Sequence, residues 1–270
     1  MTRPGLSRFL RGDRTWWQEA IVLAAVYQAY ESARGHLPQP AGLALQHARQ
    51  LVALERALGL FWEATVQRWF LPWHPVVELF DAYYGTIHFI VPAAALLLLW
   101  LRDRPRYRRY RNAFGFMLAV ALVGFAAWPV TPPRLYPPPP RFVDTADAIG
   151  GLGPLDRGSM KDDNLYAAMP SLHVGWALWC TVALVPVLRR RSAKAAAAAY
   201  PAATVLVIVA TANHWVLDGV GGAAALAAGL GLEQARRRLV ARSREKSSGC
   251  SLDLEPEDLG VVTVDRGHDP

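Results

Sequence analysis

The chain contains several apolar runs of about 20 residues that are almost free of charged side chains, which is the length a helix needs to cross a bilayer. Six such runs lie at residues 16–34, 76–101, 112–130, 167–188, 197–212 and 214–234. A soluble domain does not need so many of them. The pattern therefore predicts an all-α fold, a six-transmembrane helical bundle.

The basic residues indicate how these runs are oriented. The chain has 29 Lys and Arg against 22 Asp and Glu, and arginine-rich blocks at residues 3–14, 102–111, 189–194 and 236–244 flank the apolar runs. Cytoplasmic loops carry such blocks. We therefore expect a multi-pass protein of the cell membrane with both termini in the cytoplasm. Because each of these blocks flanks an apolar run, membrane orientation accounts for them and no nucleic-acid partner is expected.

This orientation leaves outer loops at about 35–75 and 131–166 and a tight turn near Asn213. In the first loop, apolar residues between Leu43 and Phe70 recur at helical spacing. The loop is expected to form one or two amphipathic helices at the membrane interface. Capping of the bundle and a role in substrate entry both remain open for them.

The second outer loop is rich in proline over residues 131–140, which predicts an ordered extended segment rather than a helix. Gly150, Gly151 and Gly153 then permit tight turns. After Val240 the composition changes to Ser, Glu, Asp and Gly. We expect a membrane-embedded domain over 1–242 and a disordered cytoplasmic tail over 243–270.

Ionisable residues at the ends of membrane spans are costly, so they are candidates for function. Ser171 and His173 lie at the predicted outer start of the fourth span, and His214 and Asp218 at that of the sixth. Arg134 lies at the outer end of the third. The orientation was derived from Lys and Arg alone, yet it places all five residues at the same depth on the same side.

The spacing of His214 and Asp218 predicts a nucleophile. Residues four apart on a helix share a face, so the carboxylate can accept a hydrogen bond from one imidazole nitrogen. The other nitrogen is then unprotonated and nucleophilic. Attack on phosphorus would give a phosphohistidine intermediate at the outer face of the bilayer.

Phosphoryl transfer also requires a proton for the leaving oxygen and donors around the phosphate oxygens. His173 can supply the proton. Arg134 offers a planar fork of donors, and Ser171 adds a neutral donor beside the N-terminus of the fourth span. Lys161 and Asn164, just before this motif, are weaker candidates. This chemistry requires no metal and no other cofactor.

The segment Pro170-Ser171-Leu172-His173, followed by His214 and Asp218, resembles the second and third motifs of the type-2 phosphatidic acid phosphatase superfamily. Within it, the segments 131–135, 167–173 and 213–215 are more similar to the inositol phosphorylceramide synthase-like branch. The resemblance covers about residues 76–235. It implies that His214 is the nucleophile, Asp218 its orienting partner, His173 the acid and base, and Ser171 a phosphate donor.

Two positions depart from the family pattern. The superfamily has an arginine six residues before the nucleophile, where this chain has Ile208, and a glycine between Ser and His, where it has Leu172. The first departure raises the importance of Arg134. The resemblance implies a lipid phosphate or phospholipid as substrate, with water or a polyol as acceptor, and the sequence leaves hydrolysis and transfer open.

His88 shares a helical face with Tyr84 and Asp81 in the second span. These side chains are expected either to pack or to line a substrate cavity. An alternative of another class is a haem-binding membrane protein with His88, His173 and His214 as axial ligands. It does not account for Ser171, Arg134 or the spacing of His214 and Asp218. A transporter is a third possibility, although no internal repeat supports it.

Overall fold

The computed structural model describes residues 15–137, 141–149 and 164–252. The described part is helical, and its only β-type pairing is an isolated bridge between Val130 and Ala167. Its α-helices are α2 (Trp16–Gly35), α3 (Ala41–Ala57), α4 (Glu63–Phe70), α5 (His74–Arg102), α6 (Arg104–Ala127), α7 (Thr145–Ile149), α8 (Leu172–Leu184), α9 (Arg191–Ala210) and α10 (Val216–Leu252). Contacts divide the chain into two units, Met1–Glu233 and Gln234–Pro270. The helix packing and the site described below lie in the first unit.

Among the described residues, four helices are long and apolar enough to cross a membrane: α5, α6, α9 and the part of α10 from Val216 to Ser243. The chain is thus a membrane protein, as its apolar runs predict. The other two predicted spans are less clear-cut. The apolar helix α8 has only 13 residues, and α2 carries charged side chains near both ends, among them Glu19 and Arg34.

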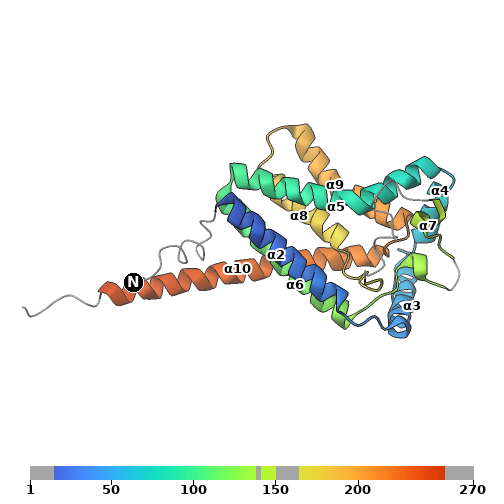
Figure 1. Ribbon diagram of the computed structural model, residues 1–270, viewed down its shortest axis with the longest axis horizontal. Coiled ribbons are helices and arrows are strands. Elements are labelled where there is room, and N and C mark those ends of the chain that lie inside the picture. Colours follow the sequence, from blue (N-terminus) through green and yellow to red (C-terminus); the bar gives the residue numbers. More distant parts are fainter. Residues whose placement is uncertain (1–14, 138–140, 150–163, 253–270) are drawn as a thin grey trace, which may run out of the picture. The chain divides into compact units, whose positions relative to one another are not determined.

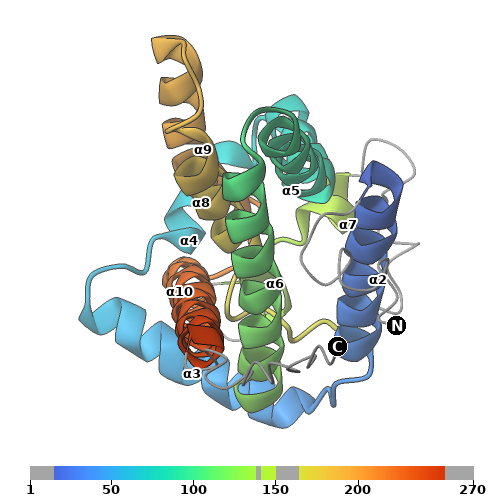
Figure 2. The same cartoon turned by 90° about the vertical axis from the view of Figure 1, so that its left-hand side faces the viewer.

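The long helices form one bundle in which α8 is central. It packs against α5, α6 and α9, while α2 packs against α6 (Figures 1 and 2). Leu99 of α5, Met117 of α6 and Trp179 of α8 meet in the largest core cluster and are fully buried. The indole N–H of Trp179 donates to the carbonyl oxygen of Tyr110 over 2.9 Å, so this buried polar group is satisfied.

Glycines allow α10 to approach α6 and α8 closely. A Cβ atom at Gly229 would lie 2.6 Å from the carbonyl oxygen of Ala113 and 2.8 Å from the backbone nitrogen of Met117. These are backbone atoms of α6, which cannot rotate out of the way. Small residues at helix contacts are the usual means of close packing in membranes.

Figure 1 shows α3, α4 and α7 gathered at the end of the bundle where α10 begins. The helices α3 and α4 fall in the loop that was predicted to contain one or two helices. Ala48, Leu51 and Val52 of α3 form a core cluster with Trp215, directly before α10. This end of the bundle is therefore covered by packed helices.

Several boundaries differ from the predicted ones. The fourth span was predicted to start at residue 167, but α8 begins only after Pro170 and ends before Pro186, because proline disrupts a helix interior. The second outer loop contains a short 3₁₀ turn, η1 (Pro133–Leu135), and α7, so it is not wholly extended. Gly150, Gly151 and Gly153 lie outside the described residues.

The helix α10 continues to Leu252, into the segment predicted to be a disordered tail. No proline or glycine interrupts the chain between Leu232 and Ser248, so nothing local ends the helix there. Residues 253–270 of the predicted tail lie outside the described residues.

Candidate active site

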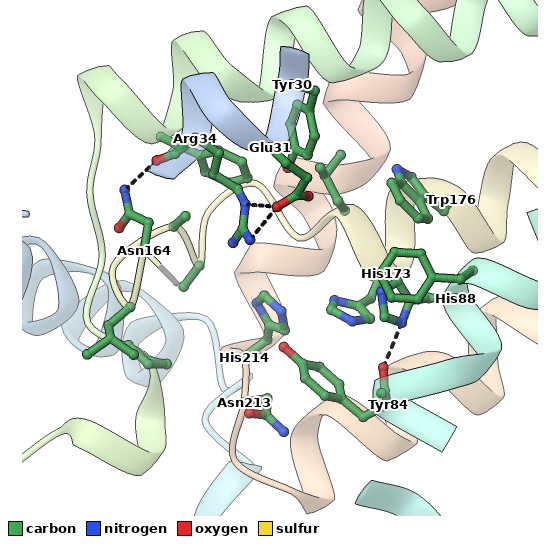
Figure 3. A pocket seen from close by; sticks show the side chains of 18 of the residues that line it. Tyr30, Glu31, Arg34, Tyr84, His88, Asn164, His173, Trp176, Asn213 and His214 are labelled. Carbon is green, nitrogen blue, oxygen red and sulfur yellow. Dashed lines mark hydrogen bonds and ion pairs between the residues drawn. The ribbon is translucent and has the colours of Figure 1, made fainter. Parts of the chain in front are cut away.

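A cavity of about 460 Å³ opens within the bundle, below α2 and beside the start of α8 (Figure 3). It brings together polar residues from six parts of the chain: α2, α5, η1, the segment before α8, α8 itself and the turn between α9 and α10. Nine of its polar lining residues are Glu31, Arg34, Tyr84, His88, Arg134, Asn164, His173, Asn213 and His214. Six of these nine were predicted from the sequence.

The turn between α9 and α10 positions His214. The backbone N–H groups of Asn213 and His214 both donate to the carbonyl oxygen of Ile208, over 3.0 and 3.2 Å, and so close the end of α9. Ala212 within this turn has a φ of 53°, a left-handed conformation that glycine or asparagine usually adopts. The chain thus holds a strained residue beside the predicted nucleophile.

Asp218 holds the imidazole of His214. Its Oδ2 accepts from Nδ1 of His214 over 3.2 Å and from the backbone N–H of Trp215 over 2.9 Å, and the side chain is fully buried. Because a carboxylate only accepts, the hydrogen lies on Nδ1 and the lone pair lies on Nε2. His214 lines the cavity, whereas Asp218 lies behind it.

The prediction paired these two residues through one helical face, and this geometry differs in the structure. The helix α10 begins at Val216, so His214 precedes it and Asp218 lies in its first turn. Asp218 therefore accepts hydrogen bonds from His214 and Trp215, just before the helix, as a helix-capping side chain does.

His173 lies opposite His214, in the first turn of α8. The centroids of their two rings are 5.4 Å apart. His173 stacks on Tyr84 of α5 at 4.1 Å and contacts His88 at 4.3 Å. Its Nε2 is buried and has no hydrogen-bond partner among the described residues, and the residue lines the cavity. The imidazole is therefore a candidate for proton exchange with a bound molecule.

Tyr84 and His88 both line the cavity, which agrees with the cavity-lining alternative for this face of α5. Nδ1 of His88 bonds to the carbonyl oxygen of Tyr84 over 2.6 Å, one turn earlier on the same helix. Asp81, on the same face, accepts from the hydroxyl of Thr145 on α7 over 2.9 Å, so it joins two helices.

Arg134 reaches the cavity from η1 and is firmly held. Its Nη1 donates to Oδ1 of Asn213 over 2.8 Å, its Nε pairs with Asp144 at 3.3 Å, and its backbone N–H donates to Ala212 over 2.9 Å. Two of these partners lie in the turn that carries His214. Arg134 is thus tied directly to the segment that carries His214, the predicted nucleophile.

The other predicted donors are placed differently. Asn164 lines the cavity and donates through Nδ2 to the carbonyl oxygen of Arg34 over 3.3 Å. Ser171 is fully buried and does not line the cavity, while its backbone N–H donates to the carbonyl oxygen of Asp218 over 2.8 Å. Lys161 lies outside the described residues.

Two buried carboxyl groups that the sequence did not suggest as site residues hold the start of α10. Glu63 of α4 accepts from the backbone N–H of Val216 over 2.9 Å, and Glu55 of α3 accepts from that of Leu217 over 2.8 Å. Both side chains are fully buried. The first N–H groups of a helix lack partners within it, so these carboxyl groups satisfy two of them.

Glu55 and Glu63 are electrostatically coupled, and Oε2 of each carboxyl group is buried without a hydrogen-bond partner among the described residues. Burial, together with the charge of Glu63, raises the pKa of Glu55 to about 9, and burial raises the pKa of Glu63 as well. Two adjacent buried carboxylates would repel each other, so we infer that the pair shares one proton near neutral pH. The pair thus presents one negative charge to the positive end of α10.

Sequence reasoning also missed Glu31 and Arg34 of α2, which line the cavity as an ion pair. The sequence did indicate this pair, because the two charged residues interrupt the first apolar run at the end predicted to lie on the outer side. The sequence contains no such indication for Glu55 and Glu63. Both glutamates alternate with apolar residues on helices whose polar positions were expected to face solvent or lipid headgroups.

A family model described as the PAP2 superfamily matches residues 49–232, more than half of the chain. The chain belongs to this superfamily. The match confirms the resemblance to type-2 phosphatidic acid phosphatases, and it spans His173, His214 and Asp218. No curated protein and no solved structure gives a significant match to the chain.

Membership supports a phosphatase-type phosphoesterase that acts on a lipid phosphate at the membrane. The haem alternative finds little support in the cavity. The rings of His88 and His173 contact each other at 4.3 Å, which leaves no room between them for a porphyrin. Nδ1 of His214 is engaged by Asp218. The three histidines therefore form one cluster on one side of a cavity rather than facing ligands.

Proposed function

We propose that the protein is an integral membrane enzyme that cleaves or transfers a phosphate ester of a lipid through a phosphohistidine on His214. The observation that carries this proposal is the His214 imidazole, which Asp218 holds at Nδ1 while the ring lines a cavity shared with His173 and Arg134. This arrangement provides a nucleophile, a proton donor and a cation within one site.

In the first step, the lone pair on Nε2 of His214 forms a bond to phosphorus as the bond from phosphorus to the leaving oxygen breaks. His173 donates its proton to that oxygen. In the second step, the oxygen of water or an alcohol bonds to phosphorus, the phosphorus–nitrogen bond breaks, and His173 accepts the proton from the incoming hydroxyl. Arg134 stabilises the charge on the phosphate oxygens in both steps.

The acceptor distinguishes a phosphatase from a phosphotransferase, and both activities share the first step. The segments 131–135, 167–173 and 213–215 resemble the inositol phosphorylceramide synthase-like branch, which favours an alcohol such as a polyol. We therefore include transfer of a lipid head group in the proposal. The charge pattern supports six spans, both termini in the cytoplasm and a cavity on the extracytoplasmic side.

The test incubates purified protein with lipid phosphates and phospholipids, with and without polyol acceptors, and identifies the products by mass. We expect free phosphate or a new phosphodiester from the wild type, and neither from His214→Ala. His74→Ala is the matched control, because His74 is exposed at the start of α5 and does not line the cavity. EDTA should leave the activity unchanged, since the proposed steps use only side chains.

Full activity of His214→Ala at normal expression would overturn the mechanism. Loss of activity in both His214→Ala and His74→Ala would indicate general damage. Trapping of a 32P-labelled, acid-labile adduct in the wild type and in His74→Ala, but not in His214→Ala, would establish the intermediate.

A further inference from the structure

An ion pair on α2 faces the same cavity as His214. Nε and Nη2 of Arg34 both donate to Oε2 of Glu31, over 3.3 and 2.8 Å, and both side chains are largely buried. Figure 3 shows the pair between α2 and the cavity that His214 lines. Both residues precede residue 49, where the family match begins.

The phosphate site lacks the cation that the superfamily pattern places six residues before the nucleophile. Ile208 occupies that position and is buried against Val174 and Val209. Apart from histidines, the basic residues among those lining the described cavity are Arg34 and Arg134. A phosphoryl group in transfer spreads negative charge over three oxygens, which one arginine at one edge does not surround.

Arg34 lines the same cavity as His173 and His214, and Figure 3 shows its guanidinium group pointing towards His214. Its backbone is fixed as well, because Asn164, in the segment that leads to α8, donates to its carbonyl oxygen over 3.3 Å. The two hydrogen bonds to Oε2 of Glu31 orient the guanidinium, as pre-organisation of a phosphate-binding group requires.

We propose that Arg34 binds the phosphate of the substrate as the second cation of the site, and that Glu31 positions it. This inference rests on the proposed function. Arg34 thereby replaces, from a helix outside the matched region, the charge that is absent at Ile208. The competing explanation is that Arg34 only complements the C-terminal dipole of α2, a role that any cation in the last turn fulfils.

The experiment compares Arg34→Gln, Arg34→Lys and Glu31→Gln for kcat, KM and competitive inhibition by inorganic phosphate. Arg34→Gln should lower kcat/KM on the order of 100-fold, as loss of one charged donor to a transition state does. Arg34→Lys should still lose about 10-fold, because lysine keeps the charge but not the planar fork. Inhibition by phosphate should weaken in both variants.

Glu31→Gln distinguishes phosphate binding by Arg34 from a role of Arg34 that is limited to its ion pair with Glu31. It removes a negative charge beside Arg34, so inhibition by inorganic phosphate should become stronger or stay unchanged, opposite to Arg34→Gln. The matched control is Arg68→Gln, which removes an equal charge from α4 at a residue that does not line the cavity. Its kinetics should match the wild type. Melting temperatures in detergent establish that each variant is folded.

Full activity of Arg34→Lys with unchanged phosphate inhibition would overturn the inference and assign Arg34 to the helix dipole. Equal weakening of phosphate inhibition in Arg34→Gln and Glu31→Gln would overturn it too, because the ion pair would then act only structurally. Activity of His214→Ala would instead refute the proposed function. An inactive His214→Ala beside a fully active Arg34→Gln would refute this inference alone.

Discussion

Replacing Glu55 by glutamine should make the protein less sensitive to alkaline pH. The proton that Glu55 shares with Glu63 keeps two buried carboxyl groups together at the start of α10. When this proton is lost, two negative charges face each other, with Asp218 as a third carboxylate nearby. Glutamine has the same shape, still accepts from the N–H of Leu217 and cannot ionise.

The magnitude follows from the pKa. The pKa of Glu55 has its ordinary value of 4.5 in the unfolded chain and is about 9 in the folded protein. Because the folded value is the higher one, the stabilisation is fully present below about pH 4.5 and is lost as the pH rises to about 9. The free energy of unfolding falls by about 1.4 kcal/mol per pH unit within this window. Between pH 7 and 9 the loss is on the order of 3 kcal/mol.

The assay is thermal unfolding in detergent between pH 6 and 10, with activity measured in parallel. We expect the melting temperature of the wild type to fall relative to that of Glu55→Gln as the pH rises to about 9, and the difference to level off above it. Glu78→Gln, on α5, is the matched control because it removes an equal charge outside the pair. Parallel curves for the wild type and Glu55→Gln would refute the shared proton.

Two further substitutions test other parts of the structure. Asp218→Asn should lower kcat on the order of 1000-fold with little change in KM, because Asp218 lies behind the cavity and orients the nucleophile; a change in KM alone would contradict this role. Gly229→Ala should reduce stability by about 1 to 3 kcal/mol, because its Cβ would meet the backbone of α6. Gly231→Ala is the control, since its Cβ meets no atom within 4 Å, and equal melting temperatures for the two variants would argue against the close contact.

The predicted site residues coincide best with the cavity lining where they lie close together in sequence or at matched predicted depths. The charge blocks predicted that the segments around Arg134, His173 and His214 lie on one side of the membrane, and all three residues line one cavity. The partnership of His214 and Asp218 was also predicted, although it arises from a capping turn rather than from a helical face. Short-range spacing limits the partners that a residue can reach, whichever local structure forms.

Contacts between distant segments could not be predicted in this way. Glu55 and Glu63 were expected at polar positions of surface helices, yet both are fully buried because α3 and α4 pack over the start of α10. Ser171 follows the family pattern but lies behind the cavity wall. Which face of an amphipathic helix is covered depends on the neighbouring elements, and the local sequence does not specify them.

The sequence by itself determined the membrane class, the helical fold and the motif residues of the site. Apolar length, charge bias and spacing are properties of single segments, and the bilayer allows few alternatives to helices. Only the tertiary structure brought Arg34 to the cavity of His214 and placed two carboxyl groups against the N-terminus of α10. These contacts join helices far apart in the chain, and their existence depends on how the helices pack together.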